Sequence, residues 1–529
     1  MENNEINRIT AYDFEKLHQK LANGELSPQL VLLAYQHKAY QVDQTTNAVI
    51  EFLYPNLSEI NLDGPLKGIP ISVKECINIK GHSIHTGCAS LLLSEPPTED
   101  CLAIKLIKDL GGIPFVRTNV VQTMMSVLSL NPLDGDTKNP LDLSKSPAGS
   151  SSGEGALISG GGSIIGIGTD IGGSIRLPAA MCGIYGFKPT TGRLTSRGSS
   201  SVAVQPITPA TWGPLTKDID GLVFLMQNLF AHELMVKHDP YIPPVKLVKE
   251  LKPKLRFGYY FSDRTHVPVP AVYRAIKHVK SKLEESGHEL VHFSLPFDGN
   301  DSERHYLKTI LLDGGINFVN LIKNDNIISP LQKSLLFYNA PRWYKKMNLI
   351  KAKLKGQDSA KALAAMGYDS VTDLFKFMKE NVTKRLLMVD AFNQAGIDVL
   401  VGPVCGMAAA FPLEPKNSFT GMLTYLGLWN WTLCPAGSMP SGLKVEEQDL
   451  LPLQRASQNA DGSKSLSPSQ SDADLNMEVY PTHDSYHKAM IELQVDTKGL
   501  PISVQVTALP WKDELCLHAM KIIDIAVKS

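Results

Sequence analysis

The fold of this chain is decided by Gly168-Thr169-Asp170-Ile171-Gly172-Gly173-Ser174-Ile175-Arg176, which follows an apolar segment at residues 163–167. The apolar segment is typical of a buried strand, and the residues from 175 onward are typical of a helix. A strand, a glycine-rich turn and a helix in this order form an α/β unit. Upstream lies a serine-rich run, Ser146-Pro147-Ala148-Gly149-Ser150-Ser151-Ser152-Gly153-Glu154-Gly155. Glycines beside serines leave the backbone open to close approach, as a serine nucleophile with a backbone oxyanion hole requires.

The same alternation recurs along the chain. Residues 68–74 read as a strand, and residues 100–110 read as a helix that Gly111-Gly112 ends before the strand at 113–116. Strands are also expected at 184–187, 397–401 and 500–506, and helices at 154–159, 218–230 and 271–286. This pattern predicts a three-layer α/β/α fold around a large mixed, mostly parallel central sheet.

The overall composition excludes several classes of protein. The chain has 529 residues, 43% of them hydrophobic, and a formal net charge of -1, which gives no support for a nucleic-acid partner. The seven cysteines are scattered and show no CxxC spacing. We therefore expect no disulfide framework, no metal and no cofactor, and a reducing compartment.

The domain organisation is expected to be simple. Residues 1–60 read as a helical region that packs on the core, and residues 61–529 as one catalytic domain. Within it, residues 448–474 are rich in Ser, Gln, Asp and Asn and predict a flexible insertion. The polar, acidic start and the lack of a run of 18 apolar residues predict neither a signal peptide nor a transmembrane helix. We expect an intracellular protein, in the cytoplasm or on the cytoplasmic face of an internal membrane.

Lys74 is a candidate base for the serine cluster because it ends the apolar strand at 69–73. A serine hydroxyl needs an adjacent base, and a lysine serves only when it is neutral. Its pKa must fall from about 10.4 to about 7–8, a cost of about 4 kcal/mol that burial can impose. The alternative is an exposed lysine on an edge strand, where it blocks aggregation.

The glycine turn offers backbone donors. The N–H groups of Ile171, Gly172, Gly173 and Ser174 could converge on a developing oxyanion, where one donor contributes about 2.7–4 kcal/mol. The alternative is a non-catalytic protein that binds an anion or a nucleotide on the same turn. The spacing fits neither G-x-G-x-x-G nor a P-loop, which makes that alternative weaker.

These residues resemble the signature region of the amidase signature family of serine hydrolases, over residues 65–220 and again near 435–437 and 500–517. The resemblance implies a catalytic triad of Lys74, Ser150 and Ser174: neutral Lys74 removes the proton of Ser174 through Ser150, and an acyl-enzyme is then hydrolysed. It also implies a cis Gly149–Ser150 peptide bond, and a brace of Asp170 and Arg176 on the oxyanion loop.

Two residues depart from the family pattern. Ala148 and Ser152 stand where the relatives have glycine. Ala148 adds a methyl group where the chain is crowded, and Ser152 adds a third hydroxyl that could compete with Ser150 for the relay role.

Within the family, residues 154–158, 508–517 and 124–126 resemble the fatty acid amide hydrolases. This implies hydrolysis of N-acylethanolamines such as anandamide and primary amides such as oleamide, with Met124 and Met125 lining an acyl channel, and a homodimer. Methionine suits such a channel because its side chain is flexible and polarizable. The alternatives within the family are a small-amide amidase and an amidotransferase subunit.

Residues 335–367 occupy the place of a membrane-facing cap in that subgroup. From 342 to 355 the chain has six basic residues and no acidic one, interleaved with aromatic and aliphatic side chains. Such a segment is typical of a helix on an anionic membrane surface. The contacts we expect are Arg342, Trp343, Lys345, Lys346 and Lys351.

Overall fold

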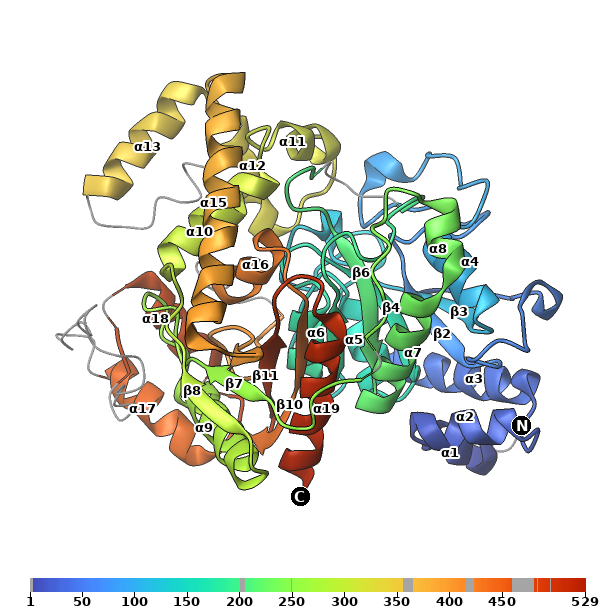
Figure 1. Cartoon of the computed structure of the whole chain (residues 1–529). Coiled ribbons are helices and arrows are strands. Elements are labelled where there is room, and N and C mark those ends of the chain that lie inside the picture. Colours follow the sequence, from blue (N-terminus) through green and yellow to red (C-terminus); the bar gives the residue numbers. More distant parts are fainter. Residues whose placement is uncertain are drawn as a thin grey trace.

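A single large sheet forms the centre of the molecule (Figure 1). The computed structural model describes residues 3–199, 205–248, 250–354, 365–413, 423–458, 480–482, 484–494 and 496–529. Within them the sheet has eleven strands in the order β1 (Val49–Phe52), β3 (Ile113–Thr118), β2 (Pro70–Lys74), β4 (Ile165–Asp170), β6 (Thr211–Thr216), β5 (Tyr185–Lys188), β10 (Ala436–Lys444), β11 (Pro501–Thr507), β9 (Val399–Pro403), β7 (Arg256–Tyr259) and β8 (Glu289–His292).

The sheet is mixed, as predicted, but it is not mostly parallel. Among the described strands, β3, β2 and β4 pair in parallel, and so do β9, β7 and β8. The pairings from β4 through β6, β5, β10 and β11 to β9 are antiparallel, as is β1 with β3. The hydrophobic pattern does not predict strand direction, because the connections between strands set it. The pattern also does not predict the central strands β6 and β10.

Helices cover both faces of the sheet. A Cβ on Gly186 of β5 would meet Ala179 and Ile175 at the start of α6 (Arg176–Cys182), whereas Gly437 of β10 faces Met520 of α19 (Asp513–Lys528). Because Gly437 pairs with Phe187, the neighbour of Gly186, α6 and α19 lie on opposite faces. The predicted three-layer α/β/α arrangement is confirmed.

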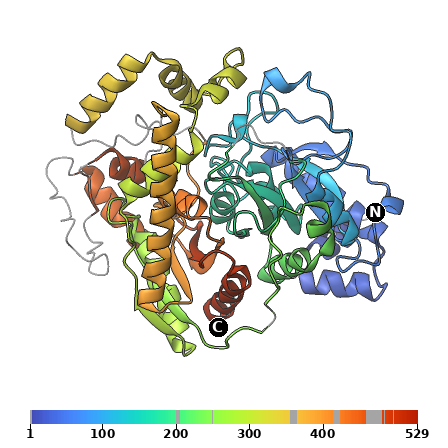
Figure 2. The ribbon, with the colours of Figure 1, turned by 45° about the horizontal axis from the view of Figure 1, so that its top comes forward.

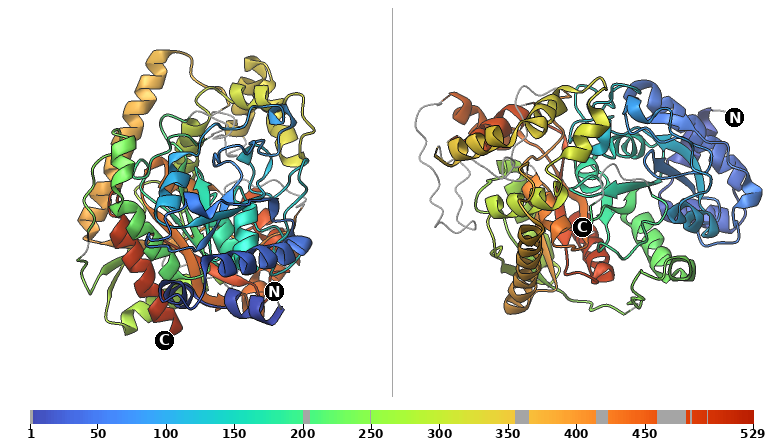
Figure 3. Two further views of the ribbon diagram at one scale, coloured as in Figure 1. Left: turned by 90° about the vertical axis from the view of Figure 1, so that its right-hand side faces the viewer. Right: turned by 90° about the horizontal axis from the view of Figure 1, so that it is seen from above.

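The two halves of the chain build the two halves of the sheet. The six strands from β1 to β5 come from residues 49–216, and the five from β10 to β8 come from residues 256–507. Figure 2 and the right-hand view of Figure 3 show the blue to mid-green elements of the first half of the chain on one side of the molecule and the yellow-green to orange elements on the other, with α19 between them. One apolar core nevertheless runs from Ile9 to Ala526.

The start of α3 shows how local sequence sets a helix boundary. Ser27 caps α3 by accepting from the amide of Leu30, and Pro28 is its first residue. The helices are α1 (Asn3–Thr10), α2 (Phe14–Ala22), α3 (Pro28–Thr46), α4 (Leu102–Asp109), α5 (Ser152–Ser159), α6 (Arg176–Cys182), α7 (Ile219–Ala231), α8 (Glu233–His238), α9 (Pro270–Glu285), α10 (Gly299–Ile310), α11 (Ile316–Ile322), α12 (Ser329–Asn339), α13 (Arg342–Leu354), α15 (Val371–Ala395), α16 (Leu423–Trp431), α17 (Glu447–Gln458), α18 (Ser485–Gln494) and α19 (Asp513–Lys528).

Two predictions about segments need correction. Residues 1–60 are not wholly helical, because Val49–Phe52 forms the edge strand β1. Residues 448–458 are not a flexible insertion but lie in helix α17, whose Leu450 and Leu453 are buried. These two leucines pack the helix against the core, although the polar composition of the segment does not predict a packed helix. Residues 459–474 lie outside the described residues.

The segment predicted as a cap, residues 335–367, contains the end of α12 and all of α13, and α13 lies at the outer edge of the molecule in Figures 1 and 2. Residues 355–364 of that segment lie outside the described residues. In the described part of the chain, no helix is both long enough and apolar enough to span a bilayer.

The parallel strands β2 and β4 position the predicted site. Val73 pairs with Ile167, so the next residue of β2, Lys74, lies beside the end of β4 at Thr169 and Asp170. The carboxyl ends of adjacent parallel strands meet at one edge of a sheet, where α/β proteins place their ligands. The glycine turn before α6 and the serine-rich loop before α5 both lie next to this edge.

Candidate active site

Lys74 is fully buried, with 0% of its surface exposed. Its Nζ lies 2.7 Å from Oγ of Ser150 and 2.8 Å from Oγ1 of Thr169, and 3.5 Å from the carbonyl oxygen of Thr169. These contacts are to hydroxyls and a carbonyl rather than to a carboxylate. The alternative of an exposed edge-strand lysine is therefore wrong, since β2 lies inside the sheet between β3 and β4.

Burial lowers the pKa of Lys74 below its usual 10.5, because an ammonium without water around it is poorly solvated. The nearby thiol of Cys76 and the carboxyl groups of Asp170, Glu154 and Glu75 act in the opposite direction, and desolvation prevails. The geometry therefore favours the neutral amine that a lysine base requires.

Ser150 is the serine that contacts the lysine. The peptide bond between Gly149 and Ser150 is cis, as predicted from the resemblance. Ser152, the competing hydroxyl, is the first residue of α5, and its Oγ donates to the carbonyl of Asn119 at 3.3 Å. Ser152 makes no hydrogen bond to Lys74, so Ser150 is the hydroxyl of this pair that contacts the amine.

The serine-rich loop and the glycine turn are joined directly. The amide of Ser151 donates to the carbonyl of Ser174 at 3.2 Å. Ser174 itself is half-buried, whereas Ser150 is buried. Of the two hydroxyls, the one predicted to attack substrate is thus the more accessible.

The oxyanion loop differs from the prediction at one residue. The amide of Gly173 donates to Oδ1 of Asp170 at 2.8 Å, so it is already engaged. Among the described residues, no protein group accepts a hydrogen bond from the amides of Ile171, Gly172 or Ser174. These three amides are therefore the available donors of the predicted set.

Asp170 and Arg176 brace this loop from inside the protein. Both side chains are 0% exposed, and Arg176 binds both carboxylate oxygens of Asp170 at 3.0 Å. Arg176 also donates to Gln505 at 2.7 Å and to Asn430 at 2.6 Å. The guanidinium holds the pKa of Asp170 well below its usual range despite burial. The pair is thus a buried bidentate bridge and not a surface ion pair.

Two groups near Lys74 were missed from the sequence. One is the hydroxyl of Thr169, the second contact of the amine. The other is Glu154, whose carboxylate accepts from Ser72 at 2.5 Å and from Thr118 at 2.7 Å. Burial raises the pKa of Glu154 to about 7. The alternation along β2 could have indicated this polar cluster, because Ser72, which binds Glu154, and Lys74 must face the same side of the sheet.

The two predicted channel residues, Met124 and Met125, are both half-buried but differ in their neighbours. Met125 packs against an apolar cluster that contains Tyr306, Leu428 and Trp429, and so does Ile171 of the oxyanion loop. Met124 packs against the main core instead. Only Met125 therefore shares an apolar wall with the glycine turn.

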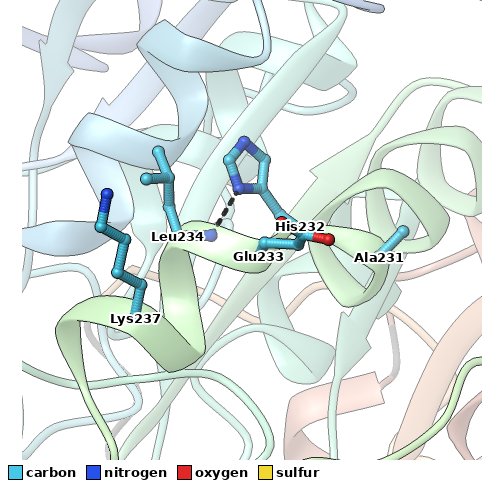
Figure 4. Close-up of a pocket in the computed structure, with 5 residues that line it drawn as sticks. All are labelled: Ala231, His232, Glu233, Leu234 and Lys237. Carbon is cyan, nitrogen blue, oxygen red and sulfur yellow. Dashed lines mark hydrogen bonds between the residues drawn. The ribbon is translucent and has the colours of Figure 1, made fainter.

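A surface recess elsewhere is not part of this site. It is lined by Ala231, His232, Glu233, Leu234 and Lys237 (Figure 4). His232 accepts from the amide of Leu234 at 3.2 Å through Nδ1, and its Nε2 lies 2.9 Å from Asp109. Asp109 ends α4 and precedes the first residue of β3, whereas Lys74 is the last residue of β2, which runs parallel to β3. The recess therefore lies toward the amino-terminal ends of these strands, opposite Lys74.

Comparisons with known proteins agree with this geometry. A family model described as Amidase matches residues 30–517. Fatty-acid amide hydrolase 1 of Sus scrofa is 33% identical over 98% of this chain and 86% of its own length. Fatty acid amide hydrolase 1 of Caenorhabditis elegans is 31% identical over 98% and 89%. A solved structure of a fatty acid amide hydrolase superposes with a TM-score of 0.82 at 27% identity, covering 100% of this chain and 87% of that one.

The family model spans nearly the whole chain, and two relatives above 30% identity cover almost all of it. The alternative of a non-catalytic anion-binding protein is thereby excluded. The chain belongs to the amidase signature family and is an amidohydrolase.

Proposed function

We propose that this enzyme hydrolyses amides by a Ser-Ser-Lys mechanism. The observation that carries the proposal is the contact of a buried amine with a buried serine, next to a more accessible serine. A neutral amine has two hydrogens and one lone pair. Its hydrogens can bind the hydroxyl and carbonyl oxygens of Thr169, which leaves the lone pair for the hydroxyl proton of Ser150.

In this mechanism Ser150 passes the proton of Ser174 to Lys74 while Oγ of Ser174 attacks the amide carbon. The amides of Ile171, Gly172 and Ser174 stabilise the negative charge on oxygen. The proton then returns through Ser150 to the leaving nitrogen, the C–N bond breaks and an acyl-enzyme remains. Water attacks that ester by the same proton route, and the carboxylic acid is released.

We further propose that the substrates are fatty acid amides. The relatives named above are called fatty acid amide hydrolases, and the apolar cluster beside Ile171 and Met125 offers a wall for an alkyl chain. Each buried methylene contributes about 0.8 kcal/mol, so a long acyl chain gains strongly from such a wall. A small-amide amidase would need no such surface.

A fluorophosphonate probe tests the nucleophile. We expect it to label Ser174, and we expect Ser174→Ala to lose both the label and amide hydrolysis. Lys74→Ala should label far more slowly, because the hydroxyl loses its base. Ser152→Ala is the matched control and should label like the wild type, since its hydroxyl binds Asn119. Absence of label at Ser174 in folded, active enzyme would contradict the mechanism.

The neutral state of Lys74 is testable through stability. Between the lowered pKa of the folded state and 10.5, the folded protein keeps the amine uncharged whereas the unfolded chain protonates it, so the unfolded state binds more protons. The free energy of unfolding of the wild type, minus that of Lys74→Met, should therefore rise with pH toward 10.5, by up to about 1.4 kcal/mol per pH unit.

Urea unfolding between pH 8 and pH 10 measures this difference, above the pKa of about 7 of Glu154. Thr497→Val, at a buried hydroxyl that binds the carbonyl of Gln494 and no ionisable group, should show no such pH-dependent difference. A difference that is flat, or that falls as pH rises, would show that Lys74 is charged in the folded enzyme.

The lipid assignment is tested by comparing oleamide with acetamide. We expect kcat/KM to be far higher for oleamide, and Met125→Glu to lower it for oleamide by at least about tenfold, because the acyl chain would have to desolvate a carboxylate. Turnover of acetamide should change little. Met124→Glu is the control on the neighbouring residue, and it should leave the preference for oleamide over acetamide unchanged because Met124 packs on the main core. Equal turnover of the two amides by the wild type would refute the lipid assignment.

The membrane contact is also proposed, with two corrections to the expected residues. Lys345 is only 9% exposed, and its Nζ donates to the carbonyls of Tyr338 and Ala365, so it cannot meet a membrane. Arg342 is exposed but pairs with Asp369. Trp343, which is 68% exposed, remains available, as do the exposed Lys346 and Lys351.

We expect the protein to bind anionic liposomes at low salt and to release them at high salt. Lys346→Glu with Lys351→Glu should weaken binding, because each lysine near the surface contributes about 1 kcal/mol. Lys80→Glu with Lys138→Glu reverses two exposed lysines in the N-terminal half and serves as the control. Cosedimentation that is insensitive to salt, or equally weak in both variants, would argue against this contact. The homodimer implied by the resemblance stays a prediction.

A further inference from the structure

Tyr306 of α10 lies directly against the oxyanion loop. A Cβ placed on Gly172 would lie 1.9 Å from the hydroxyl oxygen of Tyr306, so this oxygen touches the backbone of the loop. On its other side, a Cβ on Gly427 of α16 would lie 2.6 Å from Cγ of the ring. The ring is therefore held between the loop and α16, which packs beside α10 (Figure 1).

The hydroxyl of Tyr306 makes no hydrogen bond within the described part of the chain, although the residue is only 3% exposed. Its oxygen is not among the fully buried atoms that lack a partner, so it retains some exposed surface. Phenylalanine would fill the same space without a hydroxyl that the protein leaves unbonded. A phenol in this position points to a partner that the protein itself does not supply.

The place of the hydroxyl indicates what that partner is. Gly172 lies between Ile171 and Ser174, both half-buried, and the amides of all three residues lack a protein acceptor. A negative oxygen formed at Ser174 would therefore meet backbone donors from the same short stretch that Tyr306 contacts. Burial and the nearby charge of Asp170 raise the pKa of Tyr306 far above its usual 10, which keeps its proton in place as a donor.

We propose that Tyr306 is a further catalytic residue, whose phenol O–H donates a hydrogen bond to the carbonyl oxygen of the substrate as that oxygen becomes negative. The inference rests on the proposed function. The Oγ–C bond from Ser174 forms, the π electron pair of the carbonyl moves onto oxygen, and the phenol keeps its own proton throughout. When the intermediate collapses, the electron pair returns and the C–N bond breaks.

The variant Tyr306→Phe tests the proposal, because it removes one oxygen and keeps the ring. We expect kcat for amide hydrolysis to fall by about 10²–10³ with little change in KM, as for other oxyanion donors. A trifluoromethyl ketone, which forms a hemiketal oxyanion with the nucleophilic serine, should lose affinity by a similar factor. The thermal midpoint should change little, because the hydroxyl makes no hydrogen bond within the described part of the protein.

Tyr486→Phe is the matched control, since Tyr486 is a buried tyrosine of the main core whose hydroxyl also packs on a glycine, Gly406. It should leave both kcat and inhibitor affinity unchanged. An active wild type with an unaltered kcat in Tyr306→Phe overturns this proposal alone, and so does a loss confined to KM and thermal stability. A wild type that neither hydrolyses amides nor labels at Ser174 overturns the proposed function together with it.

Discussion

The desolvated amine of Lys74 is the constraint on which the rest of this structure depends. Its hydroxyl contacts, Ser150 and Thr169, come from the serine-rich loop and from strand β4, so the amine holds this loop and the end of β4 together. A charged lysine in the same place would need a carboxylate at contact distance. The fold instead surrounds the amine with neutral oxygens, which satisfy its hydrogens without favouring an added proton.

Placing an amine there requires the strand order that the structure shows. Lys74 ends β2, which lies between β3 and β4, and both of these strands run parallel to β2. The glycine turn follows β4 directly and is held by Asp170, whose carboxylate accepts from Gly173 and Arg176. The bridge continues through Asn430 of α16 and Gln505 of β11, so the second half of the chain fixes the geometry of a loop in the first half.

The sequence predicts this site to the extent that its features are local or shared with the family. The triad residues, the cis peptide bond and the Asp170–Arg176 brace follow from a contiguous motif, and the structure brings Lys74 and Ser150 together. Contacts between distant segments could not be predicted. Tyr306 reaches Gly172 only because α10 packs on α16, and Lys345 is buried only because α13 folds back against Tyr338 and Ala365. The charge pattern of residues 342–355 reads the same whether a lysine points outward or inward.

Glu154 shows how the same burial acts on an acid. Its carboxyl lies on the face of β2 that carries Lys74, with Ser72 and Thr118 as its hydroxyl partners, and a Cβ on Gly166 would collide with it. Burial raises its pKa to about 7 while lowering that of Lys74, so a single apolar environment moves both groups toward their uncharged forms. Their mutual attraction favours the ionised pair and opposes this shift, but the carboxylate is bound by hydroxyls and does not contact the amine. Because each group is bound by its own set of hydroxyls, the acid can remain near the base without taking the place of Ser150.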